Sequence, residues 1–124
     1  MRYLLWAGVS VAAGLLIASS CLLSQSDRVR PLVHFVSPHA GDSLGPGLFQ
    51  LKAVATDDKR MSRVVFWARD KMLGFDRFPV ADTYELTVAQ DSSLQGSYLL
   101  TADAVDWAHN EGFDTVRVFF RSAP

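Results

Sequence analysis

Apolar and polar residues alternate with a period of two along most of the chain beyond Pro31. Turn-forming residues interrupt the alternation every eight to fourteen positions, and no window of eleven residues carries the apolar stripe of a helix. The pattern predicts strands at 32–36, 48–56, 63–69, 71–75, 83–89, 98–105 and 114–121. Seven short strands with this spacing are typical of a β-sandwich. We therefore expect one all-β domain over residues 31–121.

The same alternation assigns one side of each strand to a core between two sheets. The side chains expected there are Phe49, Leu51, Ala53, Val64, Phe66, Leu100, Ala102, Val118 and Phe120. Tyr98 stands near the start of the sixth predicted strand. We expect its hydroxyl to bond back to the preceding loop, as the corner tyrosine of a sandwich does.

The first 23 residues have a different character, because Leu4 to Leu23 form a run of twenty residues without a charge. A run of this length fits a membrane-spanning helix, and its first part also fits the apolar region of a signal peptide. The segment predicts a hydrophobic leader helix over 1–23, used as a signal peptide or as a membrane anchor. The polar residues 24–30 would then form a spacer.

Three small residues, Ala18, Ser19 and Ser20, precede Cys21. This arrangement resembles a bacterial lipoprotein signal, in which the cysteine is acylated and becomes the new N-terminus. Two alternatives stay open: lipidation at Cys21, or a signal anchor in which Cys21 is a small buried residue. Both predict a protein that is exported and membrane-anchored, on the extracytoplasmic face of the cell envelope.

Charge and cysteine content exclude several classes of function. The net charge is −1, so we expect no nucleic-acid partner. Cys21 is the only cysteine, which excludes an intrachain disulfide and a cysteine-based zinc site. Oxygen ligands for calcium could come from Asp57, Asp58, Asp106, Asn110 and Asp114. Their spacing is not that of a calcium loop, so we expect them to cap turns and we expect no metal or other cofactor.

Two segments repeat the pattern x-Ala-x-Ala-x-Asp, at Lys52–Asp57 and Thr101–Asp106. With Pro31–Pro38, Arg63–Trp67 and Gly96–Asn110, they resemble the bacterial Ig-like domains of exported and surface proteins. The resemblance implies an Ig-like, fibronectin III-like sandwich that serves in binding or structural presentation. His109 and Lys71 stand where that family typically has glycine, and a residue with a Cβ resists positive φ.

One alternative function is enzymatic. Gly41–Gly45 contains the Gly-Asp-Ser-Leu string of an esterase and lipase family, and Asp106 and His109 could complete a triad with Ser43. That family builds its site on an α/β scaffold, and Pro46 and Gly47 follow Ser43 where a helix would be needed. We therefore expect a non-enzymatic module, with the esterase as the alternative.

Four aromatic residues are not placed in the core by the alternation: Trp67, Trp107, Phe113 and Phe119. Exposed aromatic side chains can stack on sugar rings or anchor a protein partner. They form the candidate binding surface; the alternative is that Trp107 covers the end of the sandwich and that Trp67 and Phe119 pack on the spacer or on another protein. The partner expected is an envelope polysaccharide or a neighbouring protein.

Overall fold

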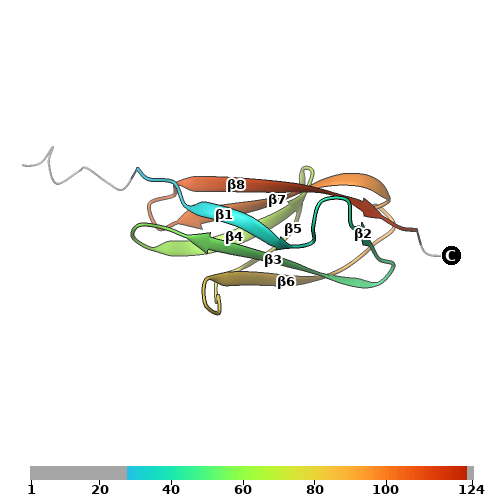
Figure 1. Cartoon of the computed structure of the whole chain (residues 1–124), viewed down its shortest axis with the longest axis horizontal. Coiled ribbons are helices and arrows are strands. Elements are labelled where there is room, and N and C mark those ends of the chain that lie inside the picture. The colour runs from blue at the N-terminus through green and yellow to red at the C-terminus, as the bar shows by residue number, and fades with distance from the viewer. Residues whose placement is uncertain (1–27, 123–124) are drawn as a thin grey trace, which may run out of the picture.

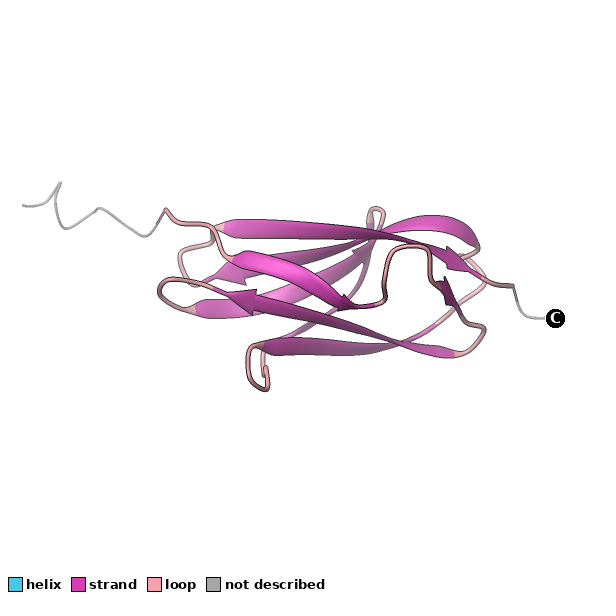
Figure 2. Ribbon diagram, in the orientation of Figure 1, coloured by secondary structure: helices cyan, strands magenta, loops and turns pink. Residues whose placement is uncertain are grey.

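The computed structural model describes residues 28–122, which form two packed β-sheets (Figures 1 and 2). The strands in this range are β1 (Leu32–Ser37), β2 (Ser43–Leu44), β3 (Leu48–Thr56), β4 (Met61–Ala68), β5 (Lys71–Asp76), β6 (Thr83–Ala89), β7 (Gly96–Asp106) and β8 (Glu111–Phe120). One sheet has the order β1-β3-β6 and the other has the order β2-β8-β7-β4-β5. Within residues 28–122 no helix could cross a membrane. The leader helix predicted over 1–23 and the candidate lipidation residue Cys21 lie outside the described residues.

The predicted all-β sandwich is confirmed, but the predicted count of seven strands is one short for residues 28–122. The additional strand is β2, which pairs in parallel with the end of β8 inside a segment expected to be a loop (Figure 1). Two backbone hydrogen bonds hold it, from the Phe119 amide to the Asp42 carbonyl (2.8 Å) and from the Arg121 amide to the Leu44 carbonyl (2.9 Å). A two-residue strand is too short to show an alternation, so its pairing partner alone defines it.

All nine side chains predicted for the core are buried, with exposed fractions of 0 to 7%. They belong to one apolar cluster between the two sheets, and Tyr84 and Leu94 join it without having been predicted. Leu94 lies in the loop between β6 and β7 and is 2% exposed. Packing of alternate side chains from both sheets therefore stabilises the domain, and one loop closes the core.

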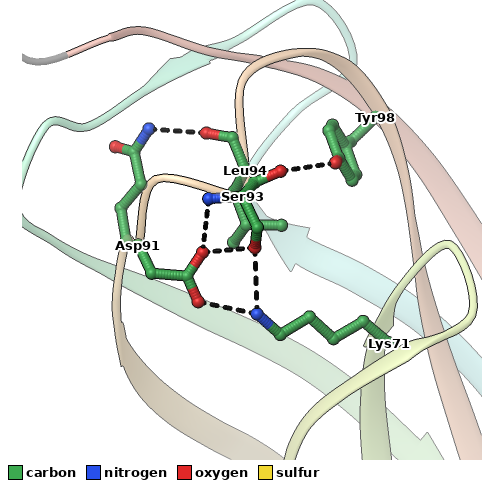
Figure 3. A network of polar contacts seen from close by, with 6 residues as sticks. Lys71, Asp91, Ser93, Leu94 and Tyr98 are labelled. Atoms are coloured by element: carbon green, nitrogen blue, oxygen red, sulfur yellow. Dashed lines mark hydrogen bonds and ion pairs between the residues drawn. The ribbon is translucent and has the colours of Figure 1, made fainter.

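The corner hydrogen bond predicted for Tyr98 is present, from its hydroxyl to the Ser93 carbonyl at 2.8 Å (Figure 3). The same loop is tied to the β4–β5 hairpin, because Lys71 Nζ lies 2.6 Å from Asp91 Oδ2 and 3.1 Å from Ser93 Oγ. Hydrogen bonds from Lys71 and then from Ser93 lower the pKa of Asp91 to about 2. These contacts hold the β6–β7 loop across one end of the sandwich.

The aspartates of the two repeated segments cap turns, as predicted. Asp57 Oδ2 accepts hydrogen bonds from the amides of Lys59 and Arg60 at 3.3 and 3.2 Å. Asp106 Oδ1 accepts from the amides of Ala108 and Asn110, each at 2.9 Å.

His109 and Lys71, which stand where the family typically has glycine, differ in backbone conformation. His109 has a φ of 66°, so it adopts the left-handed conformation that a glycine would supply there. In the β4–β5 turn Arg69, with a φ of 54°, takes that conformation instead of Lys71. The strands on either side keep their pairing in both cases.

Three turns gather at one end of the sandwich, namely β3–β4, β5–β6 and β7–β8 (Figure 1). The start of β1 lies at the same end, since Leu32 pairs with Thr56 at the end of β3. The β3–β4 and β7–β8 turns touch, because the Trp107 amide donates to the Arg60 carbonyl at 3.1 Å. We call this end the loop end.

Candidate functional site

The outer face of the three-stranded sheet is polar in its central rows. Lys52 Nζ lies 3.6 Å from Glu85 Oε1, and Gln50 Nε2 donates to Glu85 Oε2 at 3.3 Å. Thr87 pairs with Gln50 in the next row. This face has the polar character that is usual for the solvent side of an antiparallel sheet.

The outer face of the five-stranded sheet has apolar side chains in its central rows, between a row with Arg63 and Glu111 and a row with Arg117. Strand register places Phe113, Asp103, Val65 and Phe75 in one row and Thr115, Thr101, Trp67 and Met72 in the next. Phe113, Met72 and Phe75 are 57, 51 and 47% exposed, Trp67 is half-buried and Val65 is buried. We call Val65, Trp67, Met72, Phe75 and Phe113 the apolar face.

An acidic side chain lies in the middle of the apolar face. Asp103 is only 7% exposed, and its Oδ1 has no hydrogen-bond partner. Burial, and after it the neighbouring Glu111 carboxylate, raise the pKa of Asp103 to about 7, and Arg63 opposes both effects. The charge of this face therefore changes near neutral pH.

The structure divides the four aromatic residues predicted as a binding surface. Trp67 and Phe113 lie in adjacent rows of one sheet face, on strands separated by β7. Phe119 is exposed on the same face, but Arg117 lies between it and the Phe113 end of β8. Trp107 is in the β7–β8 turn, at the loop end. The predicted set thus belongs to two surfaces.

Met72 and Phe75 complete the apolar face and were not predicted. Both are on β5, which the sequence indicated as a short edge strand. Their partners in the β4–β5 register are Trp67 and Val65. The sequence could have predicted them, because β4 is apolar on both sides and β5 beside it is also apolar. Side chains of β5 then extend the apolar surface that β4 presents on the outer face of the sheet.

The second surface is a hollow of about 610 Å³ at the loop end. Its lining residues are Arg60, Met61, Ser62, Arg63, Arg77, Phe78, Asp106, Trp107 and His109. The Arg60 guanidinium carbon lies 4.6 Å from the centre of the Trp107 ring, which is a cation–π distance. Trp107 and Phe78 are 60 and 85% exposed at this hollow.

The lining of this loop-end hollow is cationic. It holds the guanidinium groups of Arg60, Arg63 and Arg77, and Asp106 is the only carboxylate in it. Asp106 is 1% exposed and accepts hydrogen bonds from the turn that it caps, including one from Asn110 Nδ2 at 2.9 Å. The hollow therefore suits an anionic group.

The triad proposed for the esterase alternative is not assembled. Ser43 on β2 pairs with Phe119, near the C-terminal end of β8. His109 lies two residues before Glu111, where β8 begins. The length of β8 separates Ser43 and His109 by roughly 25–30 Å. The geometry does not support the esterase alternative with Ser43 and His109, because nucleophile and base must lie within hydrogen-bond reach.

Three of the four carboxylates considered for calcium accept hydrogen bonds from backbone amides. Asp57 and Asp106 cap turns, and Asp114 Oδ2 accepts a hydrogen bond from the Phe35 amide at 2.8 Å. Among residues 28–122 no group of three or more His, Cys, Asp or Glu side chains is placed to hold a metal ion.

Strand order and packing together define a small β-sandwich of the Ig-like type. Residues 31–102 match the family described as a bacterial Ig domain, and the chain belongs to that family. The match ends before the turn of Asp106 and Asn110, which carried much of the resemblance seen in the sequence.

Solved structures agree with this fold. The chain is similar to fibronectin(III)-like modules of CbhA from Clostridium thermocellum, with 21% identity and a TM-score of 0.63, over 75% of this chain and 99% of that one. It is also similar to part of an endo-beta-1,4-mannanase from Thermotoga petrophila, with 10% identity and a TM-score of 0.65, over 81% of this chain and 22% of the mannanase. No match to a curated protein was found. At these identities the likeness concerns the fold alone.

Proposed function

We propose that this chain is a non-catalytic Ig-like binding module. It is anchored to a membrane through residues 1–23, displayed on the extracytoplasmic face of the cell envelope, and binds a neighbouring protein through the apolar face. Bacterial Ig and fibronectin III-like domains typically occur in extracellular or surface proteins, which supports this location. The uncharged run from Leu4 to Leu23 supports the anchor.

The contrast between the two outer sheet faces carries the proposal. The central rows of the three-stranded sheet expose an ion pair and amide groups, and its exposed Leu32 and Leu48 stand apart at opposite ends of that sheet. The five-stranded sheet instead exposes Met72, Phe75 and Phe113 in adjacent rows around Trp67. Apolar side chains that adjoin on one face indicate an interaction surface, while single exposed ones are normal. If both outer faces contacted only water, both should be polar in their central rows. The apolar face therefore indicates a binding partner.

A protein partner fits this surface better than a polysaccharide. The row of Trp67 offers the hydroxyls of Thr101 and Thr115, and the adjacent row offers one carboxyl, of Asp103. Aromatic residues and methionine with few charged groups are enriched in the buried centre of protein interfaces. Sugar recognition would need more hydrogen-bonding groups beside the rings.

Site-specific photo-crosslinking in cells that make the full-length chain tests the proposal. A photoreactive residue in place of Phe113 should give one discrete protein adduct, since Phe113 lies at the edge of the apolar face. The matched control is the same residue at Thr87, an exposed position on the other sheet, and should give none. Equal adducts from both positions, or a glycan adduct from Phe113, would contradict a protein partner on the apolar face.

A further inference from the structure

The chain enters the sandwich at the loop end. Pro31 is buried against the start of β8, where a Cβ at Gly112 would collide with the Pro31 carbonyl oxygen. Leu32 then pairs with Thr56, and the β3–β4 turn that follows Thr56 leads into the lining of the hollow. The hollow and Pro31 therefore lie at the same end of the domain, where the start of β1 adjoins the β3–β4 turn (Figure 1).

The spacer sets how far this end can be from a membrane. Residues 24–30 are seven residues, which span at most about 25 Å when fully extended. With residues 1–23 in or on a bilayer, as proposed above, the loop end stays close to the lipid headgroups. The opposite end, with β2 and the β6–β7 loop, is farther away by the length of the strands.

The side chains at the loop end have the chemistry of a membrane–water interface. Trp107 and Phe78 are exposed, and Val80 in the β5–β6 loop is 79% exposed. The guanidinium carbons of Arg60 and Arg77 lie over aromatic rings, 4.6 Å from the centre of Trp107 and 5.0 Å from that of Phe75. A guanidinium that stacks by its face keeps its N–H edge directed outward, where it can donate two parallel bonds to a phosphate.

We propose that the loop-end hollow docks on the anionic surface of the bilayer that anchors the chain. Arg60, Arg63 and Arg77 bind lipid phosphates, while Trp107 and Phe78 insert at the headgroup level. This inference rests on the membrane anchor of the proposed function. It fixes the orientation of the domain, because the loop end then faces the lipid and the apolar face stands roughly upright, open to a partner.

A bilayer fits this end better than a soluble polymer for two reasons. The exposed apolar side chains Phe78 and Val80 beside the arginines gain by insertion among acyl chains, but gain little from a hydrated polyanion. The spacer also supplies a high local concentration of headgroups without a separate binding event. Other carboxylates stand at the same end but do not line the hollow, namely Asp57, Asp58, Asp76, Asp82 and Glu111, so the positive charge belongs to the hollow and not to the whole loop end.

Paramagnetic broadening of tryptophan indole N–H signals tests the docking. The membrane-associated full chain is reconstituted in nanodiscs of phosphatidylcholine, with or without phosphatidylglycerol, that contain a gadolinium-chelating lipid. With phosphatidylglycerol present, the Trp107 signal should broaden strongly. The Trp67 signal, from the side of β4, should broaden much less and serves as the internal reference.

Paired substitutions separate a specific contact from a general charge effect. Arg60→Gln with Arg77→Gln should lower the ratio of docked to undocked domain roughly 25-fold, since each cation at an anionic surface contributes about fivefold. Arg117→Gln with Arg121→Gln makes the same charge change on β8 and beyond it, near the other end, and should leave the ratio unchanged.

Several results would overturn the docking. These are equal broadening of Trp107 and Trp67, broadening that does not need phosphatidylglycerol, or an equal effect of both variant pairs. Displacement of Trp107 from the surface by soluble polygalacturonate would assign the hollow to a polysaccharide. A chain that does not co-elute with nanodiscs would instead refute the membrane anchor, which is a separate failure.

Discussion

At the scale of single residues, Asp103 is the side chain that the sequence pattern described least well. Alternation places it on the outer face of β7, where a carboxylate would ordinarily be solvated. The cross-strand neighbours Val65 and Phe113 flank it, and it is buried. Its burial depends on side chains from three strands, and a single strand's pattern does not contain that information.

Asp103 makes the stability of the domain depend on pH in a defined window. The folded pKa is about 7 against an ordinary value of 3.8. Between these values the folded state holds a proton that the unfolded state has lost, so the free energy of unfolding falls as pH rises. Asp103→Asn should remove most of this slope in denaturant titrations. A slope that persists unchanged in the variant would show that another group is responsible.

At the scale of elements, strand prediction succeeded where each strand carries its own alternation. The core residues of β3, β4, β7 and β8 follow from it, and so does the corner formed by Tyr98. β2 and Leu94 were missed because their places come from contacts distant in sequence. β2 exists only through its pairing with β8, and Leu94 reaches the core from a loop without periodicity.

Adjacent leucines on β7 provide a test of the inward assignment. Leu100 is fully buried in the core, whereas Leu99 is on the outer side and half-buried. Leu100→Ala should lower the free energy of unfolding by about 2–5 kcal/mol, because it leaves a cavity between the sheets. Leu99→Ala should cost about 1 kcal/mol or less. A larger loss for Leu99→Ala than for Leu100→Ala in chemical denaturation would mean that β7 has the opposite orientation, and similar losses would contradict the assignment of Leu100 alone to the core.

At the scale of the whole molecule, topology assigned residues to surfaces that the sequence did not distinguish. Trp67 and Trp107 looked equivalent as aromatics outside the core, yet one is on a sheet face and the other is at the loop end. The sheet order, not the local pattern, puts β5 beside β4 and so enlarges the apolar face. The cationic hollow likewise depends on three turns meeting.

The form of the proposed anchor is tested by the intact mass of the membrane-associated protein. Acylation at Cys21, which we favour because small residues precede it, predicts loss of the first 20 residues and a mass increase from lipid. Cys21→Ser should then reduce membrane retention. A mature protein that still begins at Met1 would identify a signal anchor, and recovery of the chain in the aqueous fraction would contradict both forms.

Binding of a protein to the apolar face is tested by the crosslinking yield at Phe113 in a chain whose apolar face carries a second, polar substitution. Phe75→Ser changes an exposed side chain in the same row, at the other edge of the sheet. We expect this substitution to lower the adduct yield at Phe113 several-fold, while Gln50→Ser on the other sheet leaves it unchanged. An adduct yield that Phe75→Ser does not alter would contradict the claim.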